Sequence, residues 1–189
     1  LKAQMQLGAR LARYISALMF PPRKCLVVDL DNTLWGGVIG EDGLGGIKLG
    51  EDYPGNIFKD FQRQLKALRA RGVILAIASK NNEADVRDVF NRHPDMALSW
   101  DDFAAARINW TDKASNLLSI AQELNISTDA LAFFDDSPRE REWVHTAMPE
   151  VAVIDVPPNP EMYTQALDDA ETFDSLNLVD EDFARAEMY

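Results

Sequence analysis

Two carboxylates at the end of an apolar run are the residues of this chain best suited to chemistry. Asp29 and Asp31 lie at the carboxyl end of the run 25–30, which is rich in Val and Leu and typical of a buried strand. Carboxylates delivered by a buried strand can bind a divalent cation, and one of them can attack phosphorus and carry an aspartyl phosphate. The pair alone is a weak signal, because short acidic pairs are common in loops.

Polar residues also follow two further apolar runs. Ser79 comes after one run and the pair Asp135-Asp136 after another, while Lys113 lies in the first turn of an expected helix. Asp136 or Asp135 could add a ligand to a hard cation such as Mg²⁺. Ser79 could donate a hydrogen bond to phosphate, and Lys113 could offset negative charge. Taken singly, Asp135-Asp136 could equally be a helix N-cap, whereas Ser79 is better explained as a turn or cap residue and Lys113 as a solvated lysine.

The spacing of apolar residues predicts an α/β fold with a doubly wound, mostly parallel sheet. Strands are expected at 25–30, 73–78, 96–99, 130–134 and 151–154, and helices at 57–72, 82–91, 112–124, 139–147 and 161–170. Strands that alternate with helices form parallel sheets with right-handed crossovers, and such sheets bind ligands beyond the carboxyl ends of their strands. Asp29, Ser79 and Asp135 should therefore meet in one crevice.

The segments between these residues leave no room for a large cap domain. Residues 36–50 are rich in glycine with apolar residues between, which predicts a small hairpin-like flap. Access of water and substrate would then depend on this flap, or on a partner that acts as a lid.

Charge and composition exclude several classes of protein. The chain has 189 residues and a formal net charge of −12, which argues against nucleic acid or an anionic membrane as partner. Its single cysteine excludes an internal disulfide and fits a reducing compartment, so a cytoplasmic location is expected. No apolar run approaches the roughly 18 residues of a membrane span.

Three regions are expected along the chain. Residues 1–22 predict a lead-in helix and linker that Pro21-Pro22 ends, residues 23–175 a catalytic domain, and residues 176–189 a helical tail. The first and last residues suggest a piece of a larger protein.

Four motifs resemble those of the haloacid dehalogenase (HAD) superfamily of phosphatases and phosphotransferases: Asp29-Leu-Asp31-Asn-Thr33, Ser79, Lys113 and Phe134-Asp135-Asp136. Longer blocks are similar to the FkbH-like family within it: residues 28–43, 78–83, 107–110 and 182–189, of which the block with Trp35-Gly-Gly is quite specific. The similarity covers nearly the whole chain from about Arg23 onward.

This resemblance implies a HAD-like Rossmannoid fold and a function in polyketide biosynthesis. FkbH-like proteins take a glyceryl unit from 1,3-bisphosphoglycerate, an acyl phosphate, remove the phosphate and load an acyl carrier protein. Carried over by motif, Asp29 is the nucleophile and Asp31 the acid/base, while Ser79 and Lys113 bind phosphate.

The resemblance also implies an Mg²⁺ site. Asp29 and the backbone carbonyl of Asp31 would bind the metal together with one of the tandem acids. Asp136 is favoured as this ligand, with Asp135 close behind.

Four further residues are weaker candidates. Trp35 could contact substrate or simply pack in the flap, and Lys80 and Arg107 could bind the phosphate or carboxyl end of a glyceryl group. Cys25 could carry an acyl group during thioester loading, but a cysteine at the start of a buried strand is usually a core residue.

Two other functions remain open on the sequence alone. A HAD-type phosphatase could act on a small metabolite or a phosphoprotein, since the superfamily motifs do not separate hydrolysis from transfer. A non-catalytic docking module of a synthase could retain the fold, although the intact motif residues count against it.

Overall fold

The computed structural model describes residues 22–170 and 172–173, so the predicted lead-in helix and the tail 176–189 lie outside the described residues. Five strands form one sheet in the order β3-β2-β1-β4-β5, and every pairing is parallel. The strands are β1 (Cys25–Val28), β2 (Ile74–Ser79), β3 (Ala105–Ile108), β4 (Leu131–Phe134) and β5 (Ala152–Val153). The predicted doubly wound parallel sheet is confirmed.

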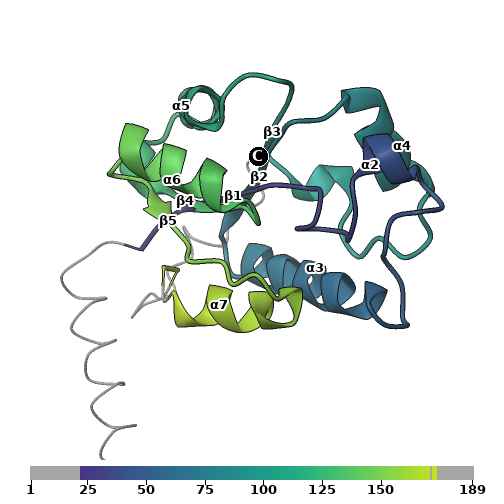
Figure 1. Ribbon diagram of the computed structural model, residues 1–189. Helices are drawn as coiled ribbons and strands as arrows, with labels where there is room; N and C mark the ends of the chain where they lie inside the picture. Colours follow the sequence, from purple (N-terminus) through teal and green to yellow (C-terminus); the bar gives the residue numbers. More distant parts are fainter. Residues whose placement is uncertain (1–21, 171, 174–189) are drawn as a thin grey trace, which may run out of the picture.

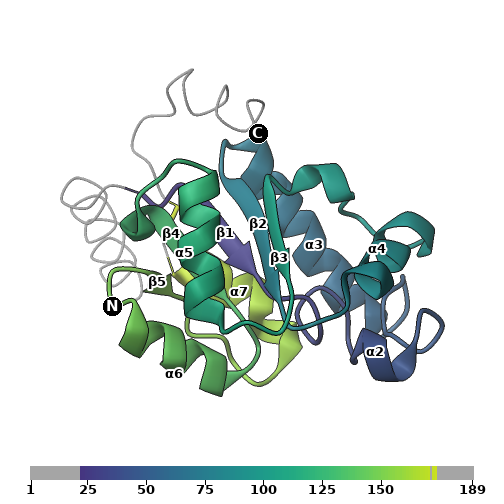
Figure 2. The same cartoon turned by 90° about the horizontal axis from the view of Figure 1, so that it is seen from above.

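Helices cover both faces of the sheet. They are α2 (Ile39–Asp42), α3 (Gly55–Ala70), α4 (Glu83–Arg92), α5 (Lys113–Glu123), α6 (Pro138–Ala147) and α7 (Tyr163–Asp169). Figure 1 shows α5 and α6 on one side of the sheet and α3 and α7 on the other, and Figure 2 shows the same arrangement from above. In the described part of the chain no helix is long and apolar enough to cross a membrane.

The central strand β1 is buried on both faces, which explains its unbroken apolar sequence. Its side chains alternate between the two layers: Leu26 and Val28 join the core under α3 and α7, and Cys25 and Val27 join the core under α5 and α6. All four residues are fully buried. Burial of this kind stabilises by about 1.5–3 kcal/mol for a large aliphatic side chain.

The predicted strand at 96–99 is wrong, and the strand lies at β3 instead. Gln62 on α3 accepts hydrogen bonds from the backbone N–H groups of Ala97 and Leu98, at 2.9 and 3.2 Å, so side-chain contacts replace a strand ladder there. Ser99 and Asp102 then form a capping box around a 3₁₀ turn, Trp100–Asp102.

The predicted flap is present, with a hairpin-like base and a helical tip. Gly36 and Lys48 pair antiparallel through two backbone hydrogen bonds of 2.7 and 3.0 Å. Between them the chain forms α2 and turns, and Gly37 adopts φ +96°, which favours glycine. From β1 to Ser79 the structure has only this flap and α3, so no cap domain lies in that segment.

Candidate active site

The carboxyl ends of three neighbouring strands carry the candidate residues. β1 lies between β2 and β4, and the register pairs Val28 with Ile77 on one side and with Phe134 on the other. The Asp29 N–H donates to the Phe134 carbonyl at 3.0 Å, which continues the ladder one residue beyond the strand. The structure therefore brings the loops of Asp29, Ser79 and Asp135 to one edge of the sheet.

Lys113 is the cation at the centre of this edge. Its ammonium lies 2.6 Å from Asp29 Oδ1, 2.6 Å from the Ala78 carbonyl and 2.9 Å from Asp135 Oδ2, and the residue is 2% exposed. Burial alone would lower the pKa of Lys113, but the carboxylates of Asp29 and Asp135 outweigh it and hold the pKa above its usual range. Lys113 is thus a fully buried, charged partner of the nucleophile candidate and not a solvated lysine.

Asp112 caps the helix that carries this lysine. It is the N-cap of α5, and its side chain accepts from the Ser115 N–H at 3.0 Å and the Ser115 hydroxyl at 2.7 Å. The first turn of α5 is thereby fixed at the point where Lys113 enters the site.

Three carboxylates form a cluster that could hold a metal ion. One oxygen each from Asp29, Asp135 and Asp136 lies within 4.8 Å of the others. Burial, followed by repulsion from Asp29, raises the pKa of Asp135 to about 7 and that of Asp136 to about 6. Asp135 Oδ2 is buried without an aligned hydrogen bond, its contact with Lys113 being an ion pair only. A hard divalent cation would relieve both the repulsion and this unsatisfied oxygen, so the residues fit such an ion.

The N-cap explanation of the tandem acids is wrong. Ser137 is the N-cap of α6, and it accepts from the Glu140 N–H at 3.4 Å, while Pro138 occupies the first turn. Asp135 accepts from the Ser137 N–H at 2.9 Å in addition to pairing with Lys113. Asp136 is half-buried, which leaves it the more accessible of the two acids.

Arg141 on α6 holds the loop that carries Asp135 and Asp136, and no sequence motif pointed to it. Its guanidinium donates to the carbonyls of Asp135 at 2.7 Å, Asp136 at 2.9 Å and Val156 at 3.0 Å. Because one planar guanidinium group binds all three main-chain carbonyls, it fixes the turn between β4 and α6.

Asp31 lies in a different environment from Asp29. Its Oδ1 accepts from the Trp35 indole N–H at 2.8 Å and the Ile39 N–H at 3.0 Å, and its Oδ2 accepts from Asn81 Nδ2 at 3.0 Å. Asn81 also donates to Ser79 Oγ at 3.1 Å. Sequence reasoning missed Asn81, although its place two residues after Ser79 puts it on the same loop.

The weaker candidates fall in different places. Trp35 is fully buried, with its ring edge-on to Phe90 at 6.4 Å, so it packs in the flap and has no free surface for a ligand. Cys25 is fully buried at the amino end of β1, and burial raises the pKa of its thiol, which leaves no accessible thiolate. The core interpretation of Cys25 therefore holds.

The two basic candidates also separate. Lys80 Nζ lies 2.6 Å from Glu140 Oε1, an ion pair that joins the loop after β2 to the first turn of α6. Arg107 donates to Ser119 Oγ at 3.0 Å and lies 2.6 Å from Glu123, so its guanidinium rests against α5. The role of Lys80 as a substrate contact therefore stays a prediction. The structure does not bring Arg107 to the carboxylate cluster.

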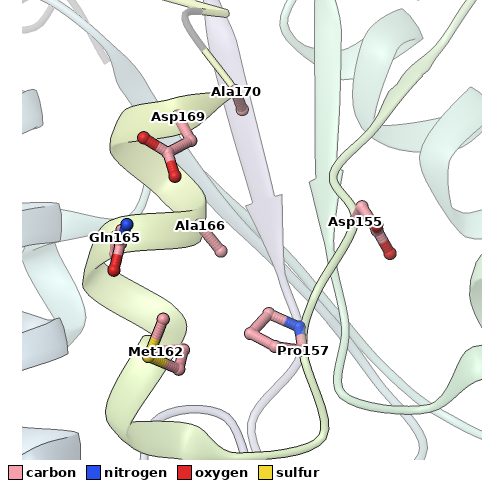
Figure 3. A pocket seen from close by; sticks show the side chains of 7 residues that line it. All are labelled: Asp155, Pro157, Met162, Gln165, Ala166, Asp169 and Ala170. Carbon is pink, nitrogen blue, oxygen red and sulfur yellow. The ribbon is translucent and has the colours of Figure 1, made fainter. Parts of the chain in front are cut away.

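A pocket of about 340 Å³ lies elsewhere, between α7 and the segment 155–157. Figure 3 shows Met162, which precedes α7, and Gln165 and Ala166 of α7 on one side, and Asp155 and Pro157 on the other. It shares no residue with the carboxylate cluster.

Comparisons with known proteins support the class of this domain. No family model matches the chain, and none of the curated proteins does. A crystal structure of the N-terminal part of the protein BF1531 from Bacteroides fragilis, which contains a phosphatase domain complexed with Mg, is 40% identical and superposes with a TM-score of 0.85. The match covers 90% of this chain and 46% of that structure, so the chain spans less than half of its length.

A second solved structure shares the fold alone. It is an uncharacterised protein from Corynebacterium glutamicum, 11% identical with a TM-score of 0.54, and the match covers 82% of this chain and 98% of that one. The five-stranded parallel sheet is thus an α/β fold like that of the phosphatase domain from Bacteroides fragilis.

Proposed function

We propose that this domain is an Mg²⁺-dependent phosphoryl-transfer enzyme of the HAD phosphatase type, with Asp29 as its nucleophile. The observation that carries the proposal is the buried cluster in which Lys113 contacts Asp29 and Asp135, with Asp136 beside them. The similar phosphatase domain of Bacteroides fragilis, which is complexed with Mg, supports the choice of metal.

Each residue has a role that follows from its contacts. Lys113 holds the Asp29 carboxylate in one orientation, and that carboxylate attacks phosphorus as the bond to the leaving group breaks. Asp31 protonates the leaving oxygen and later takes a proton from the water that releases phosphate from Asp29. Ser79 offers a hydroxyl to the phosphoryl oxygens. Asp29, Asp136 and Asp135 would hold Mg²⁺, which when bound neutralises charge on the phosphoryl group.

The finer proposal concerns the substrate and the acceptor. The similarity around Trp35-Gly-Gly supports 1,3-bisphosphoglycerate as the substrate and an acyl carrier protein as the partner that receives the glyceryl unit. The carrier thiol would attack the C1 carbonyl and expel the C1 phosphate, while Asp29 would take the phosphoryl group on C3. The small flap is consistent with this, because a site covered only by residues 36–50 leaves space for a group presented on another protein.

One experiment separates the finer proposal from its alternatives. The domain is incubated with 1,3-bisphosphoglycerate, Mg²⁺ and a holo carrier protein, and the mass of the carrier and the released phosphate are measured. A glyceryl adduct that the wild type forms and that Asp29→Asn, which leaves the C3 phosphate in place, does not form supports transfer. Phosphate release without any adduct leaves only a phosphatase, and the absence of both would favour a docking module.

A further inference from the structure

Asn81 lies between two side chains that the proposed reaction uses. It is 6% exposed, and its Nδ2 donates to Asp31 Oδ2 at 3.0 Å and to Ser79 Oγ at 3.1 Å. An amide nitrogen carries two hydrogens, so both bonds form at once and use its full donor capacity. In the structure the amide nitrogen, and not the amide oxygen, is the atom that faces both Asp31 and Ser79.

Two donors from the flap hold the opposite oxygen of the same carboxylate. The Trp35 indole N–H and the Ile39 backbone N–H both reach Asp31 Oδ1, at 2.8 and 3.0 Å. Trp35 is fully buried, so its indole group is fixed by packing. Asp31 is therefore held from two directions, by the flap on one oxygen and by the loop after β2 on the other.

We infer that Asn81 is a positioning residue that aims the Asp31 carboxyl at the leaving group, with Trp35 as its counterpart in the flap. The inference rests on the proposed phosphoryl transfer. General acid–base catalysis depends on the angle and distance at which the proton is delivered. Without Asn81, one oxygen of Asp31 loses its donor and the side chain gains freedom to rotate.

This role predicts a dependence on the leaving group. An alkyl phosphate expels a strongly basic alkoxide, which requires a proton from Asp31. Acetyl phosphate expels acetate, a weak base that leaves without one. A residue that acts through Asp31 should affect the first substrate much more than the second, while a residue that only supports the fold should affect both alike.

The test measures kcat/KM of the full chain with glycerol phosphate and with acetyl phosphate in the presence of Mg²⁺. This constant reports the steps up to the first irreversible one, which includes attack by Asp29 and loss of the leaving group. Asn81→Ala should lower kcat/KM for glycerol phosphate on the order of 10²-fold and for acetyl phosphate by less than about threefold. Trp35→Phe, which keeps an aromatic ring but loses the indole N–H together with part of the buried ring volume, should shift the ratio in the same direction.

Two further variants serve as a control and as a replacement in case Asn81→Ala does not fold. Asn82→Ala changes the neighbouring exposed asparagine, whose side chain bonds only to Asp85 at 3.3 Å among the described contacts, and should leave the ratio unchanged. Asn81→Leu keeps a similar volume without any donor, so it tests the same loss if the alanine variant unfolds.

An equal fall with both substrates, or no fall with either, would overturn the positioning role. If the wild-type chain hydrolyses neither substrate, the proposed function fails first and the inference fails with it.

Discussion

Asp29 and Asp31 are two residues apart on one loop, and the structure holds them by opposite means. Asp29 pairs with the buried Lys113 ammonium inside a group of three carboxylates. Asp31 accepts three hydrogen bonds from uncharged N–H groups, two of them from the flap. Ion pairs therefore hold the Asp29 side of the site, whereas neutral hydrogen bonds fix the orientation of the carboxyl group on the Asp31 side.

This difference assigns different consequences to the two sides. Charges removed from water interact strongly, and loss of one partner leaves the other unpaired, at a cost of several kcal/mol. A neutral hydrogen bond contributes only about 1 kcal/mol net, but it fixes an angle. Changes near Asp29 should thus alter metal binding and stability, and changes near Asp31 should alter selectivity for the leaving group.

The sharpest test of the comparison exchanges each acid for its amide. Asp29→Asn should lower phosphate release on the order of 10³-fold or more with every substrate, because it removes the nucleophile. Asp31→Asn should lower kcat/KM mainly for alkyl phosphates and much less for acetyl phosphate. Steady-state kinetics with both substrates measure this, and similar profiles for the two variants would contradict the division.

Removal of the central cation should have the next largest effect, on stability. Lys113→Met leaves Asp29 and Asp135 without their buried counterion, and we expect a loss of about 3 kcal/mol in the free energy of unfolding at pH 8 without metal. Urea unfolding in the presence of EDTA measures it.

Lys80→Met is the matched control, because it breaks a partly exposed ion pair, that with Glu140. Its cost should not exceed about 1 kcal/mol. If both variants lose the same unfolding free energy, the ion pairs of Lys113 contribute no more to stability than a partly exposed ion pair does.

The pH dependence of the metal-free protein should follow from the same cluster. The folded-state pKa values of Asp135, about 7, and Asp136, about 6, lie above the ordinary value of 3.8. A raised pKa contributes stability that is fully present below the ordinary value and is lost as pH rises through the folded value. Unfolding free energy should therefore fall between about pH 4 and pH 7, by at most about 1.4 kcal/mol per pH unit for each carboxylate.

Mg²⁺ should oppose this decline, since it binds the ionised carboxylates and stabilises the folded state by about 2.7 kcal/mol at a hundredfold excess over Kd. Thermal or urea unfolding across pH, with EDTA and with Mg²⁺, measures both effects. Asp135→Asn should flatten the metal-free curve, and a stability that instead rises from pH 5 to pH 7 would contradict the assigned cause.

The charged side of the site was the more predictable side. Asp29, Lys113 and Asp135 follow apolar strands or open a helix, and their combination in this order predicts a site although each residue alone has an ordinary explanation. Asn81 lies in a polar stretch after Ser79 and Trp35 lies beside the glycine-rich segment, and the roles of both depend on three-dimensional angles that spacing does not encode. Arg141 was missed for the same reason, since its partners are main-chain carbonyls.

The one misplaced strand has a related cause. β3 contains Ala105, Ala106, Arg107 and Ile108, with little of the β-branched character that marks a strand. It is a strand because it pairs with β2, in which Ala76 lies opposite Ala105. The strand conformation of β3 thus depends on its pairing with β2 and not on the strand propensity of its own residues.

The smallest expected effect concerns the cap that precedes Lys113. Asp112→Ala removes the acceptor of two Ser115 hydrogen bonds and should cost about 1 kcal/mol, whereas Asp112→Asn keeps a good N-cap and should cost a few tenths. The backbone N–H and hydroxyl of Ser115 hold the pKa of Asp112 below its usual range, so the stabilisation is present above about pH 4 and is lost as pH falls further.

Urea unfolding at pH 7 and pH 3 measures this difference, which should be smaller at the lower pH. Activity is the informative second readout. If the ion pairs place the lysine, Asp112→Ala keeps nearly full activity despite its lower stability. A large fall in kcat would instead mean that the start of α5 sets the position of Lys113, and the Asp29 side would then depend on direction as much as the Asp31 side does.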